Sequence, residues 1–164
     1  MLVPIKWMKQ YVDIDTDDKT LADKLTLTGS HVDAVIDYNK HVENVVTGRL
    51  LEIESHPNAD KLVVTKIDVN QGEPVQIITG ANNMRVGDIV PVALEGAVLP
   101  NGLKLKKTNF RGLPSYGMMV SYEEFGFDDK VIPKECRDGI VILDKATEIG
   151  RDIKEVLGLD GSAL

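Results

Sequence analysis

The pattern that most constrains the fold is a series of short segments rich in β-branched residues, each bounded by turn residues, that begins at residue 45. One short helix is indicated among them, where Ser121 stands three residues before Glu124 in a capping box. Five or six short strands with one small helix favour a small closed barrel over an open parallel sheet. The predicted strands are residues 45–54, 62–69, 74–80, 88–96, 102–110 and 139–143. Pro91 predicts an edge or a bulge in the fourth.

Helical signals mark the first thirty residues. Pro4 suits the first position of a helix, and Asp17 or Asp18 can cap a second helix that ends near Gly29. Two such short helices bury too little to stand alone. We therefore expect them to pack on the rest of the protein or on a partner.

A polar stretch at 37–44 separates these helices from the strands and marks the expected domain boundary. We expect an N-terminal helical segment at 1–40 and a barrel domain at 41–150. A final part at 151–164 follows, and the sequence supports a short helix within 150–158. The expected fold is thus mainly β, with short helices at both ends.

The charge balance excludes a strongly basic nucleic-acid binder. The chain has 19 Lys plus Arg against 26 Asp plus Glu, a net charge of −7, so any nucleic-acid contact must rest on a local patch. The concentrated basic stretch is residues 104–112. At its start, Leu103 and Leu105 alternate with lysines, which predicts a strand that buries both leucines. Bases could stack on Phe110 while the cations meet phosphates; the alternative is a solvated strand face with Phe110 in the core. The candidate residues are Lys104, Lys106, Lys107, Phe110 and Arg111.

The segment HPNADKL, residues 56–62, concentrates polar groups between two predicted strands. His56 precedes a proline and is pushed towards extended geometry, while Asn58 and Asp60 favour Asx-type turns, so a compact turn explains the segment without a ligand. In a five-stranded oligonucleotide-binding barrel, this loop would lie beside the usual binding face. The turn then presents His56, Asn58 and Lys61 to a partner.

Metal binding and catalysis lack the residues they need. Cys136 is the single cysteine, and the other histidines, His31 and His41, belong to no His-x-x-x-His pair. No Gly-x-Ser-x-Gly elbow or phosphate-binding loop is present. We expect no metal site and no catalytic residue. No apolar run approaches the roughly 20 residues of a membrane span or the core of a signal peptide, so we expect a cytoplasmic chain that does not enter a membrane.

Three segments together resemble the tRNA-binding domain shared by several synthetases and free-standing tRNA-binding proteins. They are HPNADKLVVTKIDVNQG, IITGANNMRVGDIVPVALEGAVLP and KKTNFRGLPSYGMMVS. The flanks VPIKWMKQYVDID, LADKLTLTGSHVDAVID and DGIVILDKATEIGRDIKEVLGLDGSAL resemble the N-terminal part of the bacterial phenylalanyl-tRNA synthetase β-subunit family. The resemblance implies a five-stranded oligonucleotide-binding (OB) barrel and makes residues 151–164 the start of a link to a further domain.

The resemblance also implies a function. In that family an α₂β₂ enzyme joins phenylalanine to its tRNA with ATP and Mg²⁺, and its catalytic sites lie outside the part matched here. We therefore expect a non-catalytic, cofactor-free module that contacts tRNA weakly and without sequence specificity, next to the rest of the β subunit and the α subunit. Two alternatives remain. One is a structural scaffold without RNA contact, which the net charge of −7 favours; the other is a free-standing dimeric tRNA-binding protein.

Overall fold

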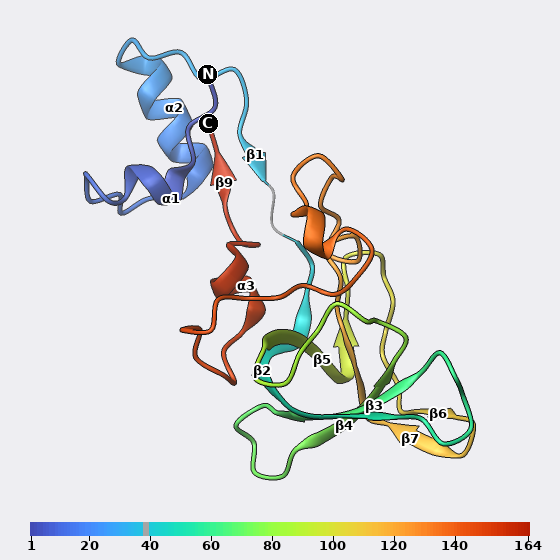
Figure 1. Ribbon diagram of the computed structural model, residues 1–164. Coiled ribbons are helices and arrows are strands. Elements are labelled where there is room, and N and C mark those ends of the chain that lie inside the picture. Colours follow the sequence, from blue (N-terminus) through green and yellow to red (C-terminus); the bar gives the residue numbers. More distant parts are fainter. Residues whose placement is uncertain (38–39) are drawn as a thin grey trace. The chain divides into compact units, whose positions relative to one another are not determined.

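The structure, a computed structural model, describes residues 1–37 and 40–164 and divides into two compact units (Figure 1). Unit 1 consists of Met1–Lys40 and Leu157–Leu164, and unit 2 of His41–Val156. Residues 38 and 39, within the expected link at 37–44, lie outside the described residues. The final part expected at 151–164 is divided between the two units.

Unit 2 is built on a five-stranded antiparallel sheet with the strand order β4-β3-β2-β5-β8. The strands are β2 (Glu43–Ser55), β3 (Val63–Asp68), β4 (Val75–Thr79), β5 (Ile89–Val98) and β8 (Gly117–Met119). The two outer strands approach each other, because the Tyr116 amide donates to Gln76 O at 3.0 Å and the Ile78 amide to Ser115 Oγ at 3.1 Å. The sheet therefore forms a nearly closed barrel, which confirms the predicted fold class.

The barrel interior is filled by alternate apolar residues of every strand. Its buried cluster comprises Leu50, Ile67, Val69, Ile77, Met84, Val90, Val92, Met119 and Ile140. Gly48 on β2 lets β3 approach closely, because a Cβ there would lie 2.6 Å from Ile67 Cγ2. The period-two pattern seen in the sequence is thus the pattern of core burial.

Pro91 lies inside β5, between β2 and β8, so the predicted edge is wrong. The register with β2 does shift in β5, but between Ala93 and Val98 and not at Pro91. Thr47 stands opposite Pro91 in the register, yet it turns its backbone groups away from β5. Its amide donates to Arg151 O at 2.9 Å and its carbonyl accepts from the Gly150 amide at 2.7 Å. The Thr47–Pro91 pair thus needs no ladder hydrogen bond, and an interior strand can hold a proline there.

The long connection between β5 and β8, residues 99–116, contains a small hairpin of β6 (Thr108–Phe110) and β7 (Leu113–Ser115). Arg111 and Gly112 form its two-residue turn, with φ of 48° and 95°, the geometry of a type I′ turn. Only the end of the strand predicted at 102–110 is therefore a strand. Leu103 is 45% exposed and Leu105 half-buried, so the predicted burial of Leu103 is wrong.

The strand predicted at 139–143 is also absent, since this stretch joins the barrel through one isolated bridge from Leu143 to Ile89. The capping box does form: the Ser121 amide donates to Glu124 Oε2 at 2.7 Å and the Glu124 amide to Ser121 Oγ at 3.3 Å. It opens a series of turns rather than the predicted helix. A short 3₁₀ helix, η1, follows at Lys134–Cys136.

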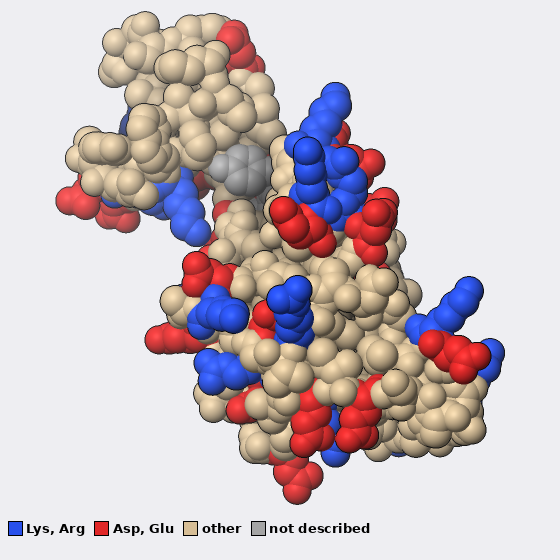
Figure 2. All heavy atoms as spheres, in the orientation of Figure 1, with Lys and Arg blue, Asp and Glu red and all other residues tan. Residues whose placement is uncertain are grey.

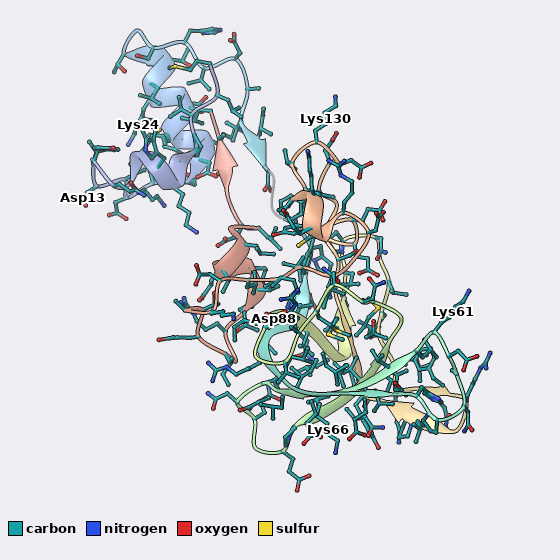
Figure 3. All side chains as sticks on the ribbon, viewed as in Figure 1. Asp13, Lys24, Lys61, Lys66, Asp88 and Lys130 are labelled. Atoms are coloured by element: carbon teal, nitrogen blue, oxygen red, sulfur yellow. The ribbon has the colours of Figure 1, made fainter. Side chains whose placement is uncertain are left out.

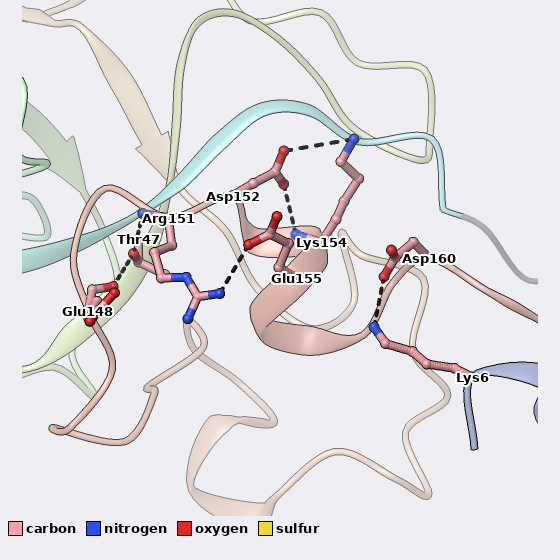
Figure 4. A network of polar contacts seen from close by, with 8 residues as sticks. All are labelled: Lys6, Thr47, Glu148, Arg151, Asp152, Lys154, Glu155 and Asp160. Carbon is pink, nitrogen blue, oxygen red and sulfur yellow. Dashed lines mark hydrogen bonds and ion pairs between the residues drawn. The ribbon is translucent and has the colours of Figure 1, made fainter. Parts of the chain in front are cut away.

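The segment after the barrel is fixed to β2 by the buried Thr47 (Figure 4). Its hydroxyl donates to Glu148 O at 2.6 Å and accepts from the Arg151 amide at 3.0 Å. The helix α3 (Ile153–Leu157) follows, within the predicted 150–158, and buries Ile153. Arg151 and Glu155 pair across its first turn at 3.1 Å.

Unit 1 contains α1 (Ile5–Met8), α2 (Asp18–Leu27) and a short antiparallel pair of β1 (Ile36–Asp37) with β9 (Ser162–Ala163). Asp17 caps α2, accepting from the Thr20 amide at 3.0 Å, and Gly29 follows the helix with a φ of 105°. Among residues 1–37 and 40–164, no helix has the length and apolar character needed to cross a bilayer.

Candidate nucleic-acid interface

Residues 56–62 form a compact connection between β2 and β3. The His56 amide donates to Leu62 O at 3.0 Å, and Ala59 packs its side chain into the protein. This is the turn predicted from the sequence. His56, however, is only 5% exposed, so its side chain faces into the protein rather than a partner.

The His56 ring holds two backbone groups. The Asn58 amide donates to Nδ1 at 3.0 Å, so Nδ1 is the unprotonated nitrogen. The other nitrogen, Nε2, lies 2.9 Å from Phe110 O and must carry the proton that it donates there. His56 is thus a neutral imidazole with both nitrogens engaged, which leaves no free nitrogen for a metal or a substrate.

A second pair of hydrogen bonds strengthens the same link. Arg111 Nη1 donates to Asn58 O at 2.9 Å, and Asn58 Nδ2 donates to Arg111 O at 3.4 Å. We call these bonds, together with the one between His56 and Phe110, the two-loop contact. It fixes the β6–β7 hairpin to the β2–β3 connection, so the structure brings four of the predicted site residues together.

The remaining predicted cations are exposed around these two connections. Lys61 points away from the β2–β3 connection into solvent (Figure 3). Lys104, Lys106 and Lys107 are exposed on the β5–β8 connection. Exposed ammonium groups at the end of flexible stems suit phosphate contact without fixed geometry.

Sequence reasoning missed Tyr116. The residue is 40% exposed, and Lys107 Nζ lies 4.8 Å from the centre of its ring, a cation–π contact. Phe110, by contrast, is half-buried. Tyr116 lies outside every strand predicted from the sequence, so no pattern indicated which way its ring faces.

The outer face of β2, β3 and β4 is hollowed beside both connections. The hollow measures about 320 Å³ and is lined by Glu52, Glu54, Ser55, Pro57, Val64, Lys66, Gln76 and Leu113. Its two carboxylates outnumber its single cation, which disfavours phosphate here. Basic and acidic side chains are also interspersed over the visible face of unit 2 (Figure 2). Cations suited to RNA therefore belong to the connections and not to the sheet face.

No metal centre is formed by the part of the chain that the structure describes, where no three His, Cys, Asp or Glu side chains gather around one point. His31 lies 3.4 Å from an Asp33 carboxylate oxygen, and His41 lies 3.5 Å from one of Glu43. Both imidazoles are largely exposed and each has a single acidic neighbour.

A nearly closed antiparallel barrel with this strand order, whose β2–β3 and β5–β8 connections meet beside the sheet, is an oligonucleotide-binding barrel. The family model described as "Putative tRNA binding domain" matches residues 45–152, and the chain belongs to this family.

Similar proteins extend the match to the flanks. The chain is 52% identical over 164 residues to the phenylalanine–tRNA ligase β subunit of Clostridium acetobutylicum and 51% identical to that of Clostridium tetani. The corresponding protein of Staphylococcus aureus is 42% identical. Each match covers the whole chain but 20% of the relative. A crystal structure of the C-terminal domain of Plasmodium vivax p43 is 28% identical, covering 49% of this chain and 46% of that one, with a TM-score of 0.39.

Proposed function

We propose that this chain is a tRNA-binding, non-catalytic part of a phenylalanine–tRNA ligase β subunit. The family match over residues 45–152 supports tRNA binding, and similarity over the whole chain to ligase β subunits supports the enzyme. Since the chain spans about a fifth of those relatives, amino-acid activation belongs to other parts of the enzyme. In this proposal the enzyme is a cytoplasmic α₂β₂ assembly. Its α subunit, with ATP and Mg²⁺, acts outside the part that this chain represents.

The observation that carries the proposal is the two-loop contact. It holds the hairpin of the β5–β8 connection against the β2–β3 connection, which joins Arg111 to the loop that carries Lys61. Lys104, Lys106 and Lys107 precede this hairpin in the same β5–β8 connection. Phosphates of the tRNA backbone would meet these cations. The expected contact is weak and independent of base sequence, because flexible lysines read charge and not base edges. The contacting residues are Lys61, Lys104, Lys106, Lys107 and Arg111, and Tyr116 adds an exposed ring on which an unpaired base could stack.

The test is a titration of fluorescently labelled tRNA with the 164-residue chain at two salt concentrations. We expect binding at low salt that weakens at high salt and falls several-fold when Lys104, Lys106 and Lys107 are replaced by alanine. A control variant with alanine at Lys24, Lys130 and Lys145, which are equally exposed, removes the same charge from other places. Absence of binding at low salt, or equal losses in both variants, would overturn the proposal.

A second candidate is a structural module that holds parts of the β subunit together. It is favoured by the exposed Glu52 and Glu54 on the sheet face, where many OB barrels receive their oligonucleotide. Charge reversal of Glu52 and Glu54 to lysine separates the two functions. An RNA-binding chain gains affinity for tRNA, whereas a purely structural module still binds none.

A further inference from the structure

A wide groove of unit 2 touches the basic stretch only at Phe110. It has a volume of about 710 Å³ and is bordered by the ends of β4 and β8, by Leu62 and Phe110 of the two connections, and by residues 121–140. The lysines of the β5–β8 connection are not among its lining residues. The proposed tRNA contact therefore leaves this groove unused.

The groove follows the gap in the barrel. Strands β4 and β8 are the two ends of the sheet order, and among the described strands no hydrogen-bonded ladder joins them. Ile78, Met119 and Ile140 form a buried floor. Leu62 and Met118 are only half-buried, so apolar surface remains open to an occupant.

The rim of the groove is acidic. Its ionisable residues are Glu123, Glu124, Asp129, Asp138 and Arg137. Glu124 is occupied by Ser121, and Arg137 donates to the carbonyl oxygen of Asp129 at 3.3 Å. Glu123 and Asp138 are exposed and form no ion pair with any described residue. Apolar walls below free carboxylates complement an apolar side chain flanked by cations, and they repel phosphate.

We propose that this groove binds a basic polypeptide segment. The segment lies extended along the gap between β4 and β8, places an apolar side chain between Leu62 and Met118, and sets lysine or arginine against Glu123 and Asp138. Its contacts are made with the side chains that line the groove, because the β4 edge already bonds Ser115 and Tyr116 through Ile78 N and Gln76 O. The barrel would then have two binding surfaces, a basic one for RNA and an acidic one for protein.

The probe for the test is a synthetic peptide, acetyl-Gly-Lys-Leu-Arg-Phe-Lys-Gly-amide, added to the ¹⁵N-labelled chain. We expect amide shifts at Gly80, Met118 and Gly139 on titration. The affinity should fall at least fivefold in the double variant Glu123→Lys, Asp138→Lys. The control Asp23→Lys, Glu73→Lys changes the same charge at exposed positions outside the groove and should bind as the unmodified chain does.

Two further probes complete the experiment: the same peptide with glutamate at its three basic positions, and single-stranded oligouridylate. The proposal is overturned by equal binding of the acidic peptide, by shifts of the groove amides with oligouridylate, or by no binding of the basic peptide at millimolar concentration. Replacing Lys104, Lys106 and Lys107 with alanine should leave peptide binding unchanged. Failure here is therefore distinct from failure of tRNA binding.

Discussion

The ring of His56 contacts the backbone through both nitrogens and so connects two loops that are far apart in the sequence. One bond stays within the β2–β3 connection and the other reaches Phe110 O of the β6–β7 hairpin. Both hydrogen bonds are partly buried, so removal of the ring deprives two backbone groups of a partner that water replaces only in part. His56 therefore fixes the two connections of the candidate interface to each other.

Replacing His56 with alanine should lower the free energy of unfolding by about 1–3 kcal/mol, since the partly buried Asn58 amide and Phe110 carbonyl lose their partner. Urea unfolding followed by circular dichroism measures this. The control is His41→Ala, because His41 is exposed and pairs only with Glu43, and its expected change is within about 0.5 kcal/mol. Equal effects of the two variants would show that the ring contributes nothing to the contact.

The sequence predicted the turn at HPNADKL but not the orientation of His56. Turn formation is local, since a residue before proline and two Asx-type residues favour it wherever they occur. The partner of Nε2, by contrast, is a carbonyl oxygen 54 positions later, on a hairpin that local patterns did not indicate. The polar residues of HPNADKL thus identified the loop, but the role of His56 depended on a backbone carbonyl that is distant in the sequence.

Strands buried on one side were predictable, and segments that leave the sheet were not. The alternation of Leu103 and Leu105 with lysines fitted a strand. The chain instead turns at residues 99–102 and lies on the end of β5, where the Leu105 amide donates to Ala97 O at 2.8 Å. Period two indicates an extended backbone, but only a neighbouring strand on the correct side makes it a buried one.

The segment after the barrel depends on Thr47. Replacing Thr47 with valine keeps the shape but removes the hydroxyl that bonds Glu148 O and the Arg151 amide. We expect a loss of about 1–3 kcal/mol and faster hydrogen exchange at the Arg151 amide. Thr108→Val is the matched control, since that hydroxyl is exposed and bonds only Lys106 O. Unchanged exchange at Arg151 in the Thr47 variant would contradict this account.

The start of α2 should respond to acid. The Thr20 hydroxyl, and next the Thr20 amide, donate to the Asp17 carboxylate and hold its pKa below the ordinary 3.8. Because the pKa of Asp17 is lowered in the folded state, the cap stabilises α2 fully at pH values above the ordinary 3.8. This stabilisation is lost as the pH falls through the lowered pKa.

The Thr20 amide resonance should report this titration, with a midpoint below 3.8. In the variant Asp17→Asn the step should disappear. Asp23→Asn, an exposed change on the same helix, should leave it in place. A step that survives in Asp17→Asn would assign it to another group.

The net charge of −7 limits how any RNA contact can work. The acidic surface repels phosphate at a distance, so attraction must come from the few cations around the two-loop contact, within about 10 Å at 0.1 M salt. We therefore expect binding of RNA by this chain alone to be weak.

The salt dependence of tRNA binding follows from that limit. Each phosphate neutralised contributes roughly 0.7–0.9 to the slope of log K against log salt. The five cations Lys61, Lys104, Lys106, Lys107 and Arg111 therefore allow a slope no steeper than about −4.5. Replacing the three lysines of the β5–β8 connection with alanine should make the slope shallower by about 2. Titrations of labelled tRNA between 20 and 200 mM salt, roughly the range in which such slopes are measured, give both values. The slope counts the phosphates that the protein neutralises. A steeper slope, or a slope that the three substitutions leave unchanged, would mean that the phosphates bind to another surface of the protein.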